Sequence, residues 1–357
     1  MPARVTIKDV ALAAGVSKGA ASNALNDRPG VSETTRQRVK DAAERLGWSP
    51  NRLAQALSGS RGDSVGWAIV RTAKTPAIDP YFTELFSGIE LELETTDLSL
   101  VTKLVADREA EAVLYRRWAS ERRVAGVLIS DIDVDEPRFE QLRELETPFV
   151  AFRSTTAAEG AMPAELRVTS VPEGLQVPTV WFQELTTVAT LLDHARTFGH
   201  RRIAWVSGDP SKAAVVLRER AVDRWSGDNG VAVRTVYTDY SPSAGAQRAV
   251  ELLRSDSPPT FIVFDSDIMA LAGLSALNAS GYGVPRDVSV ASFIDSTLCE
   301  VALPPVTALA HPVVEYGRAF TRRLIQQIGD GTGTDAWLEP PTLVKRASVG
   351  PAPAPAR

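Results

Sequence analysis

Beyond Ser64 the chain alternates short apolar runs with longer segments of helical periodicity, and this alternation constrains the fold more than any other feature. A first series of runs covers residues 64–70, 98–105, 125–130 and 147–152, and a second covers residues 201–208, 231–238, 260–265 and 288–293. Strands that alternate with helices predict parallel sheets joined by right-handed crossovers. Two series therefore predict an α/β protein with two lobes, and such lobes bind ligands in a crevice at the carboxyl ends of their strands.

The first 60 residues differ from the rest in charge. They carry nine basic and five acidic side chains, although the whole chain has a net charge of −5. A net charge of +4 in this short segment leaves −9 for the remainder. This asymmetry indicates a small basic module, suited to a polyanion, attached to an acidic body.

The basic module has the start and stop signals of three short helices. A capping box at Thr6 opens a helix over residues 7–14, Ser17 opens a second helix, and Ser32 opens a third that ends at Leu46. Glycine follows the first and the third helix. Two helices joined by a tight turn that contains glycine predict a helix-turn-helix.

The second helix, within "SKGAASNALN", has little bulk. Its alanines allow close packing, and its first residues can approach DNA without steric hindrance. Lys18 can donate to guanine, and Asn23 can pair with adenine or a phosphate. The alternative is a solvated surface helix of a small helical bundle.

Four segments resemble the LacI/GalR family of bacterial transcription regulators: "TIKDVALAAGVS", "LNDRPGVSETTRQRV", "LGWSPNRLAQAL" and "GHRRIAWVSG". Later segments such as "GVPRDVSV" and "PTLVKRAS" extend the resemblance over nearly the whole chain. It implies an N-terminal, all-α helix-turn-helix headpiece, followed by a two-lobed effector domain with parallel sheets, of the type I periplasmic-binding-protein-like fold.

The resemblance also implies boundaries. We expect a headpiece over residues 1–48, a hinge helix and linker over 49–61, and an effector-binding and dimerisation domain over 62–345. The Pro/Ala-rich residues 346–357 are expected to form a disordered tail. In the family the hinge helix folds on operator DNA and wedges a leucine into the minor groove, the position of Leu57 here.

These features predict a regulator, expected to be a repressor, that binds a palindromic operator as a homodimer. No leucine heptads indicate a tetramer. The residues expected to contact DNA are Thr6, Ser17, Lys18, Gly19, Ser22, Asn23, Asn26, Asn51, Arg52, Ala54 and Leu57.

A small-molecule effector is expected in the crevice, where the resemblance assigns Asp79, Phe82, Arg220 and Ser266. Ile294 stands where the family carries a ligand-binding carboxylate. An arginine beside an aromatic face, without that carboxylate, favours a ligand with an acidic or carbonyl group and an apolar portion. The alternative is a regulator that has lost effector binding.

Other classes are weakly supported. No Walker-A loop, dinucleotide fingerprint or nucleophile elbow occurs, and the three histidines are scattered, so we expect no enzyme, cofactor or metal site. The acid-rich residues 131–137 are more typical of a solvated loop than of a cation site. Cys299 is the single cysteine, so no intrachain disulfide can form. Without a signal peptide or an apolar membrane-length run, the protein is expected in the cytoplasm.

Two alternatives come from other functional classes. A solute-binding protein without a regulatory role would need a secretory signal and would have no use for a basic headpiece. A sequence-independent nucleoid protein would bind operator and shuffled DNA alike.

Overall fold

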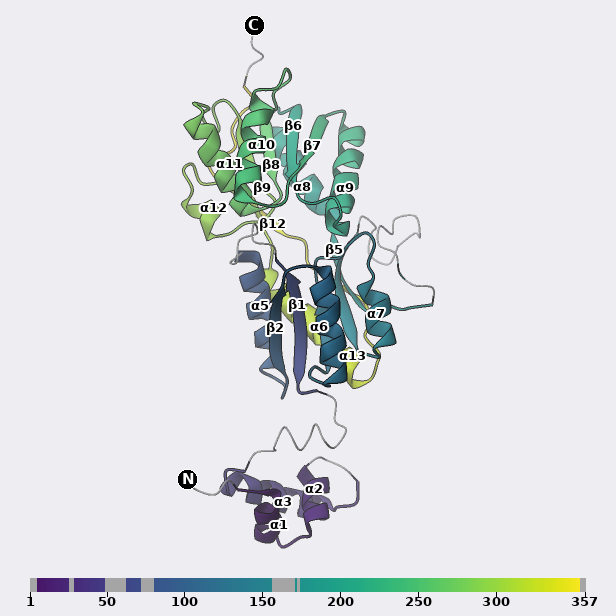
Figure 1. Ribbon diagram of the computed structural model, residues 1–357. Coiled ribbons are helices and arrows are strands. Elements are labelled where there is room, and N and C mark those ends of the chain that lie inside the picture. The colour runs from purple at the N-terminus through teal and green to yellow at the C-terminus, as the bar shows by residue number, and fades with distance from the viewer. Residues whose placement is uncertain are drawn as a thin grey trace. The chain divides into compact units, whose positions relative to one another are not determined.

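The computed structural model describes residues 5–25, 29–48, 62–71, 80–155, 171 and 174–353. The chain divides into two compact units, Met1–Gly62 and Asp63–Arg357, and each is described by itself (Figure 1). The predicted α/β class, with a helix-turn-helix headpiece and a two-lobed domain, is confirmed.

The described residues of the headpiece form three helices, α1 (Ile7–Ala13), α2 (Lys18–Leu25) and α3 (Glu33–Arg45). Small side chains dominate their shared core, so the helices pack closely; its buried members are Val10, Ala11, Ala14, Ala21, Ala24, Val39, Ala42 and Ala43. The predicted caps are present: Ser17 Oγ accepts from the Ala20 amide at 3.1 Å, and Ser32 Oγ accepts from the Thr35 amide at 3.3 Å.

The second unit has two lobes, each built on a six-stranded sheet. The first lobe has the strand order β11-β5-β4-β3-β1-β2, with β1 (Ser64–Val70), β2 (Ser99–Val105), β3 (Gly126–Ile129), β4 (Phe149–Thr155), β5 (Thr179–Gln183) and β11 (Ala336–Trp337). The second has the order β12-β10-β9-β8-β6-β7, with β6 (Arg202–Ser207), β7 (Ala232–Tyr237), β8 (Phe261–Phe264), β9 (Ser289–Ser292), β10 (Thr307–Ala310) and β12 (Thr342–Val344). The strands pair in parallel, apart from β12, which is antiparallel to β10.

Helices cover both faces of each sheet (Figure 1). In the first lobe α5 (Pro80–Leu93) and α13 (Val313–Gly329) share one face, and α6 (Arg108–Ser120) and α7 (Arg138–Glu144) share the other. In the second lobe α8 (Glu184–Thr197) and α9 (Ala213–Asn229) lie opposite α10 (Pro242–Leu253) and α11 (Asp267–Ala279). The short α12 (Thr297–Val301) follows β9.

The chain passes between the lobes three times, between β5 and α8, between β10 and α13, and between β11 and β12. Helix α13 therefore returns to the first lobe, where it packs tightly on α5. A Cβ atom on Gly88 would lie 2.0 Å from the Val314 carbonyl oxygen, and one on Gly317 would lie 2.3 Å from that of Leu85. These glycines let the two backbones touch.

The predicted disordered tail is wrong for residues 346–353, which belong to the second lobe. Ser348 is fully buried, and its Oγ donates to the Val290 carbonyl at 2.6 Å and accepts from the Thr307 amide at 2.8 Å. The Ala352 amide donates to the Phe198 carbonyl at 2.8 Å. Backbone hydrogen bonding outweighs the Pro/Ala composition on which the prediction rested.

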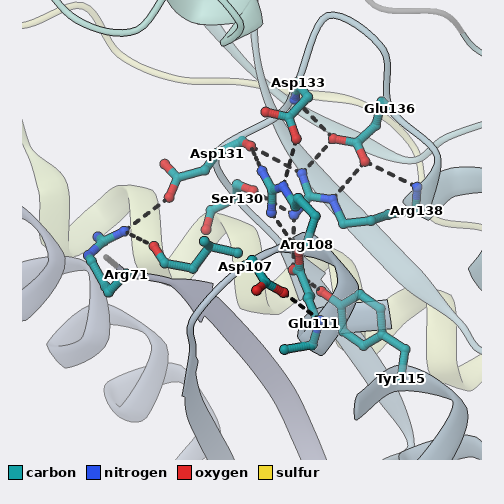
Figure 2. A network of polar contacts seen from close by, with 12 residues as sticks. Arg71, Asp107, Arg108, Glu111, Tyr115, Ser130, Asp131, Asp133, Glu136 and Arg138 are labelled. Atoms are coloured by element: carbon teal, nitrogen blue, oxygen red, sulfur yellow. Dashed lines mark hydrogen bonds and ion pairs between the residues drawn. The ribbon is translucent and has the colours of Figure 1, made fainter. Parts of the chain in front are cut away.

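A polar network joins α6, α7 and the loop after β3 (Figure 2). Fully buried Glu111 accepts from Arg108 at 2.6 Å, from Arg138 at 3.2 Å and from the Tyr115 hydroxyl at 2.7 Å. Burial opposes the charge of Arg138, but the hydrogen bond and charge of Glu136 outweigh it and raise the arginine's pKa. Each buried charge here depends on an opposite partner.

We therefore expect Glu111→Gln to lower the free energy of unfolding by about 3 kcal/mol, because it leaves buried guanidinium groups with less compensation. Urea unfolding of the full chain, followed by circular dichroism, measures this. The matched control is Glu140→Gln, which removes a carboxylate that pairs with exposed Arg143 and should change stability little. Equal stability of the two variants would contradict the role given to Glu111.

Candidate functional site

The exposed beginning of α2 is the candidate DNA-binding surface. Lys18 and Gly19 are both exposed, next to the cap formed by Ser17. A Cβ atom on Gly19 would have one neighbour within 4 Å, the Ser17 Oγ at 3.9 Å. The headpiece itself therefore leaves room for a side chain at position 19.

The other described candidates of the headpiece hold local structure. The Thr6 hydroxyl donates to Asp9 at 2.7 Å, and this carboxylate also accepts from the Thr6 amide at 2.8 Å. These bonds lower the pKa of Asp9. The Asn23 amide group donates to the Pro29 carbonyl at 3.5 Å, and Ser22 is half-buried. The remaining candidates lie outside the described residues: Asn26, Asn51, Arg52, Ala54, Leu57 and, in the second unit, Asp79.

The candidate ligand site is a crevice of about 460 Å³ lined by both lobes. Phe82 and Ser266, both assigned from the sequence, line it from opposite lobes. The Phe82 ring stacks on Trp67 with 6.0 Å between ring centroids and lies under the Arg71 guanidinium at 4.0 Å. The crevice therefore has an aromatic wall in the first lobe.

A buried arginine, Arg218 of α9, lines the second lobe's side. It binds Glu184 through two nitrogens at 3.0 and 3.1 Å and Asp265 at 2.9 Å, and lies 4.0 Å from the centroid of Phe293. Burial opposes its charge, but the two carboxylates outweigh it and raise the pKa of Arg218. Its charge is thus neutralised within the protein.

The sequence assignment of Arg220 to this role is corrected by the structure. Arg220 is exposed and is not part of the crevice lining, which contains Arg218. Two residues along an α-helix correspond to a rotation of about 200°, so the two side chains leave opposite sides of α9.

The first lobe's basic side chains are also paired where they line the crevice. Arg71 binds Asp131 at 3.3 Å (Figure 2). Arg108 binds Asp133 at 2.6 Å, and Lys212 of the second lobe binds the same carboxylate. Both cations lower the pKa of Asp133 against the effect of its burial.

The ion pair between Asp133 and Lys212 lies beside backbone hydrogen bonds that join the two lobes. The Val134 amide donates to the Ser211 carbonyl and the Ala213 amide to the Ile132 carbonyl, each at 2.9 Å. Three carboxylates of the acid-rich loop, those of Asp131, Asp133 and Glu136, are therefore paired with basic side chains, whereas Asp135 is exposed, so the predicted solvated loop is wrong for these three residues.

Ser266 and Asp267 stand at the first turn of α11, on the second lobe's wall. Ser266 Oγ accepts from the Met269 amide at 3.3 Å, so it caps the helix. Asp267 is 2% exposed, and its Oδ1 accepts from the Ile268 amide at 2.7 Å. Ile294 lines the same wall. Its apolar side chain cannot make the hydrogen bonds that a carboxylate at this position would make.

The residues assigned from the sequence did not include Arg218, Glu184 and Asp265, and Ser266 was assigned without its neighbour Asp267. A signal existed for the first of these. Arg218 lies at helical spacing with buried Ala221, Val222 and Trp225, and an arginine within such an apolar stripe must be buried. The carboxylates that pair with it come from distant segments, so no local pattern indicates them.

Two kinds of feature are absent from the described residues. They contain no helix that is both long and apolar enough to span a membrane. They also contain no group of three or more His, Cys, Asp or Glu side chains placed to hold a metal ion. Cys299 is buried, and burial raises the pKa of its thiol to about 12.

Comparisons with known proteins agree with this architecture. The family model "Bacterial regulatory proteins, lacI family" matches residues 6–51, and "Periplasmic binding protein-like domain" matches residues 192–349. The HTH-type transcriptional regulator CelR of Thermobifida fusca is 30% identical over 345 residues, which are 96% of this chain and 95% of that protein. The HTH-type transcriptional repressor CytR of Escherichia coli K12 is 28% identical over 349 residues, 96% of each.

A solved structure, described as a complex of the transcriptional regulator CelR with cellobiose, is 28% identical and has a TM-score of 0.70. The match covers 97% of this chain and 100% of that one. With 30% identity to a curated regulator over nearly its whole length, the chain belongs to the lacI family of bacterial regulatory proteins and is a helix-turn-helix transcription regulator.

Proposed function

We propose that the chain is a cytoplasmic repressor that binds a palindromic operator as a homodimer and responds to a small molecule in its interlobe crevice. The observation that carries the DNA-binding part is the exposed start of α2, where Lys18 stands beside a glycine that the headpiece does not need for space. A helix with a bare, basic first turn suits the major groove.

We propose the domain boundaries given by the sequence, a headpiece over 1–48, a hinge helix and linker over 49–61, and an effector-binding domain from 62. The division of the chain into compact units after Gly62 supports the last of these boundaries. Residues of the hinge, Leu57 among them, keep their proposed contact with the operator's minor groove.

The ligand part rests on the crevice. It has the size and the mixture of aromatic and polar walls expected of a small-molecule site, and the related regulator CelR was solved with cellobiose. A solute-binding protein without a regulatory role is less well supported, because the headpiece would serve no purpose in it.

For the headpiece, Lys18→Ala should cost about 1–3 kcal/mol on the preferred operator and relax base choice in each half-site. Fluorescence anisotropy with operators selected from random DNA measures both effects. Lys103→Ala, which removes an exposed lysine from β2 of the other unit, is the matched control and should leave specific binding unchanged. Uniform weakening on every DNA sequence would make Lys18 a phosphate contact.

Gly19→Leu separates folding from recognition. Because nothing in the headpiece lies close to a Cβ atom at position 19, the variant should melt at nearly the wild-type temperature. Operator affinity should nevertheless fall about tenfold or more, since the side chain would stand between α2 and the groove. Unchanged affinity would show that DNA does not approach this turn.

For the crevice, Phe82→Ala should weaken binding of cellobiose, the first probe, by about tenfold, because a sugar ring loses an aromatic face. Titration calorimetry with the full chain measures this. Arg220→Ala is the control, as this exposed residue lies outside the crevice lining. Loss of binding in Arg220→Ala, with none in Phe82→Ala, would place the ligand elsewhere.

A further inference from the structure

A buried carboxylate oxygen in the crevice wall has no partner in the described part of the chain. Asp267 lines the crevice and is 2% exposed. Its Oδ1 accepts from the Ile268 amide, whereas its buried Oδ2 has no hydrogen-bond partner. A buried, unsatisfied acceptor is costly and rare in a native protein, so this atom is suited to a donor that arrives with a ligand.

The surroundings of Asp267 are acidic. Burial raises the pKa of Asp267 more than the nearby Ser296 hydroxyl, which makes no hydrogen bond to Oδ2, and the Ile268 amide lower it. Exposed Glu84, in α5 of the first lobe, has its pKa raised by partial desolvation and by the charges of Asp295 and Asp267. A negatively charged ligand group would therefore meet like charge at this wall.

The basic side chains of the crevice do not offset that repulsion. Arg71, Arg108, Lys212 and Arg218 each bind a carboxylate of the protein, and Arg153 lies 4.7 Å from the centroid of Trp181. The N-terminus of α11, which could otherwise attract an anion, already has Ser266 as its cap and Asp267 in its first turn. An anion at Arg71, Arg108, Lys212 or Arg218 would have to displace an existing ion pair.

We propose that Asp267 accepts a hydrogen bond from a hydroxyl or amine of the crevice ligand, and that this ligand is uncharged or cationic, with carboxylates and phosphates excluded. The proposal rests on the ligand-binding function proposed above and names the class of compound that this site takes. It replaces the expectation of an acidic ligand, which assumed an arginine free to bind it.

The proposal also accounts for Ile294. The strand end after β9 offers an apolar side chain at 294, and Asp295 beside it is bound to Arg346 by two hydrogen bonds of 2.7 and 2.8 Å. An acceptor for a ligand donor must then come from a neighbouring element. Asp267, at the start of α11, supplies one from the same wall.

Titration calorimetry of the full chain with matched probes tests this. The neutral probes are glucose, cellobiose and maltose, the amine is glucosamine, and the anions are glucuronate and glucose 6-phosphate. We expect binding of at least one neutral or amine probe, with the anions about 30-fold weaker or undetected. Asp267→Asn should lower the affinity of the probe that binds about tenfold, because an amide NH2 group would then face the ligand's hydroxyl or amine in place of the carboxylate oxygen.

The same variant should improve the affinity of glucuronate relative to the neutral probes, a change of charge selectivity that a purely structural role would not produce. Asp256→Asn removes an exposed carboxylate outside the crevice lining and should behave as wild type. Asp267→Ser serves in the same tests if Asp267→Asn does not fold.

Three outcomes overturn the proposal: an anion that binds best, unchanged binding in both Asp267 variants, or no binding of any neutral or amine probe at millimolar concentration. Operator binding is measured on the same preparations, so that a protein that binds operator but none of the probes contradicts only the ligand proposal and not the DNA-binding function. The Asp267 variants should bind operator as wild type does when no probe is added.

Discussion

The buried guanidinium of Arg218 constrains the whole effector domain, because a charge out of water needs partners fixed in place. Its partners come from different parts of the chain: Asp265 follows β8, and Glu184 stands where the chain crosses from the first lobe to the second. Glu184 also accepts from the Ser154 hydroxyl at 2.8 Å, at the end of β4 in the first lobe. One carboxylate thus ties a strand of one lobe to a helix of the other, and any change in the angle between the lobes must act on this buried charge.

A second tie lies at the acid-rich loop. Asp133 binds Arg108 of its own lobe (Figure 2). It also binds Lys212 of the other lobe, beside two backbone hydrogen bonds between the lobes. The Arg218 cluster is almost fully buried, whereas the Asp133 pair keeps part of its surface in water. Solvent weakens an exposed ion pair far more than a buried one. The Arg218 cluster, beside the crossing from β5 to α8, is therefore harder to separate than the Asp133 contact.

The sequence predicted most strands because their apolar runs are bounded by turns, and β1 has the predicted limits, Ser64–Val70. Strands β5, β10, β11 and β12 were not predicted. Strands β11 and β12 have two and three residues, too short for a periodic signal, whereas β10 is as long as the predicted β3, β8 and β9. The helices of the headpiece could be predicted because their capping residues are neighbours in the sequence. The crevice was harder: Arg218 could have been found from its apolar stripe, but its carboxylate partners meet it only through tertiary folding.

The ordered end of the chain shows how such distant partners decide chemistry. Arg346, placed in the predicted tail, binds both carboxylate oxygens of Asp295 and also donates to the Val306 carbonyl at 2.8 Å. Ser348 fixes this segment against β9 and β10. Asp295 is thereby committed to the protein, although by sequence position it is the acidic residue nearest to the substituted Ile294. With one neighbour apolar and the other paired, a buried acceptor without a partner remains on the second lobe's wall in the Oδ2 of Asp267, so a segment outside the crevice lining helps determine which ligand groups the crevice can satisfy.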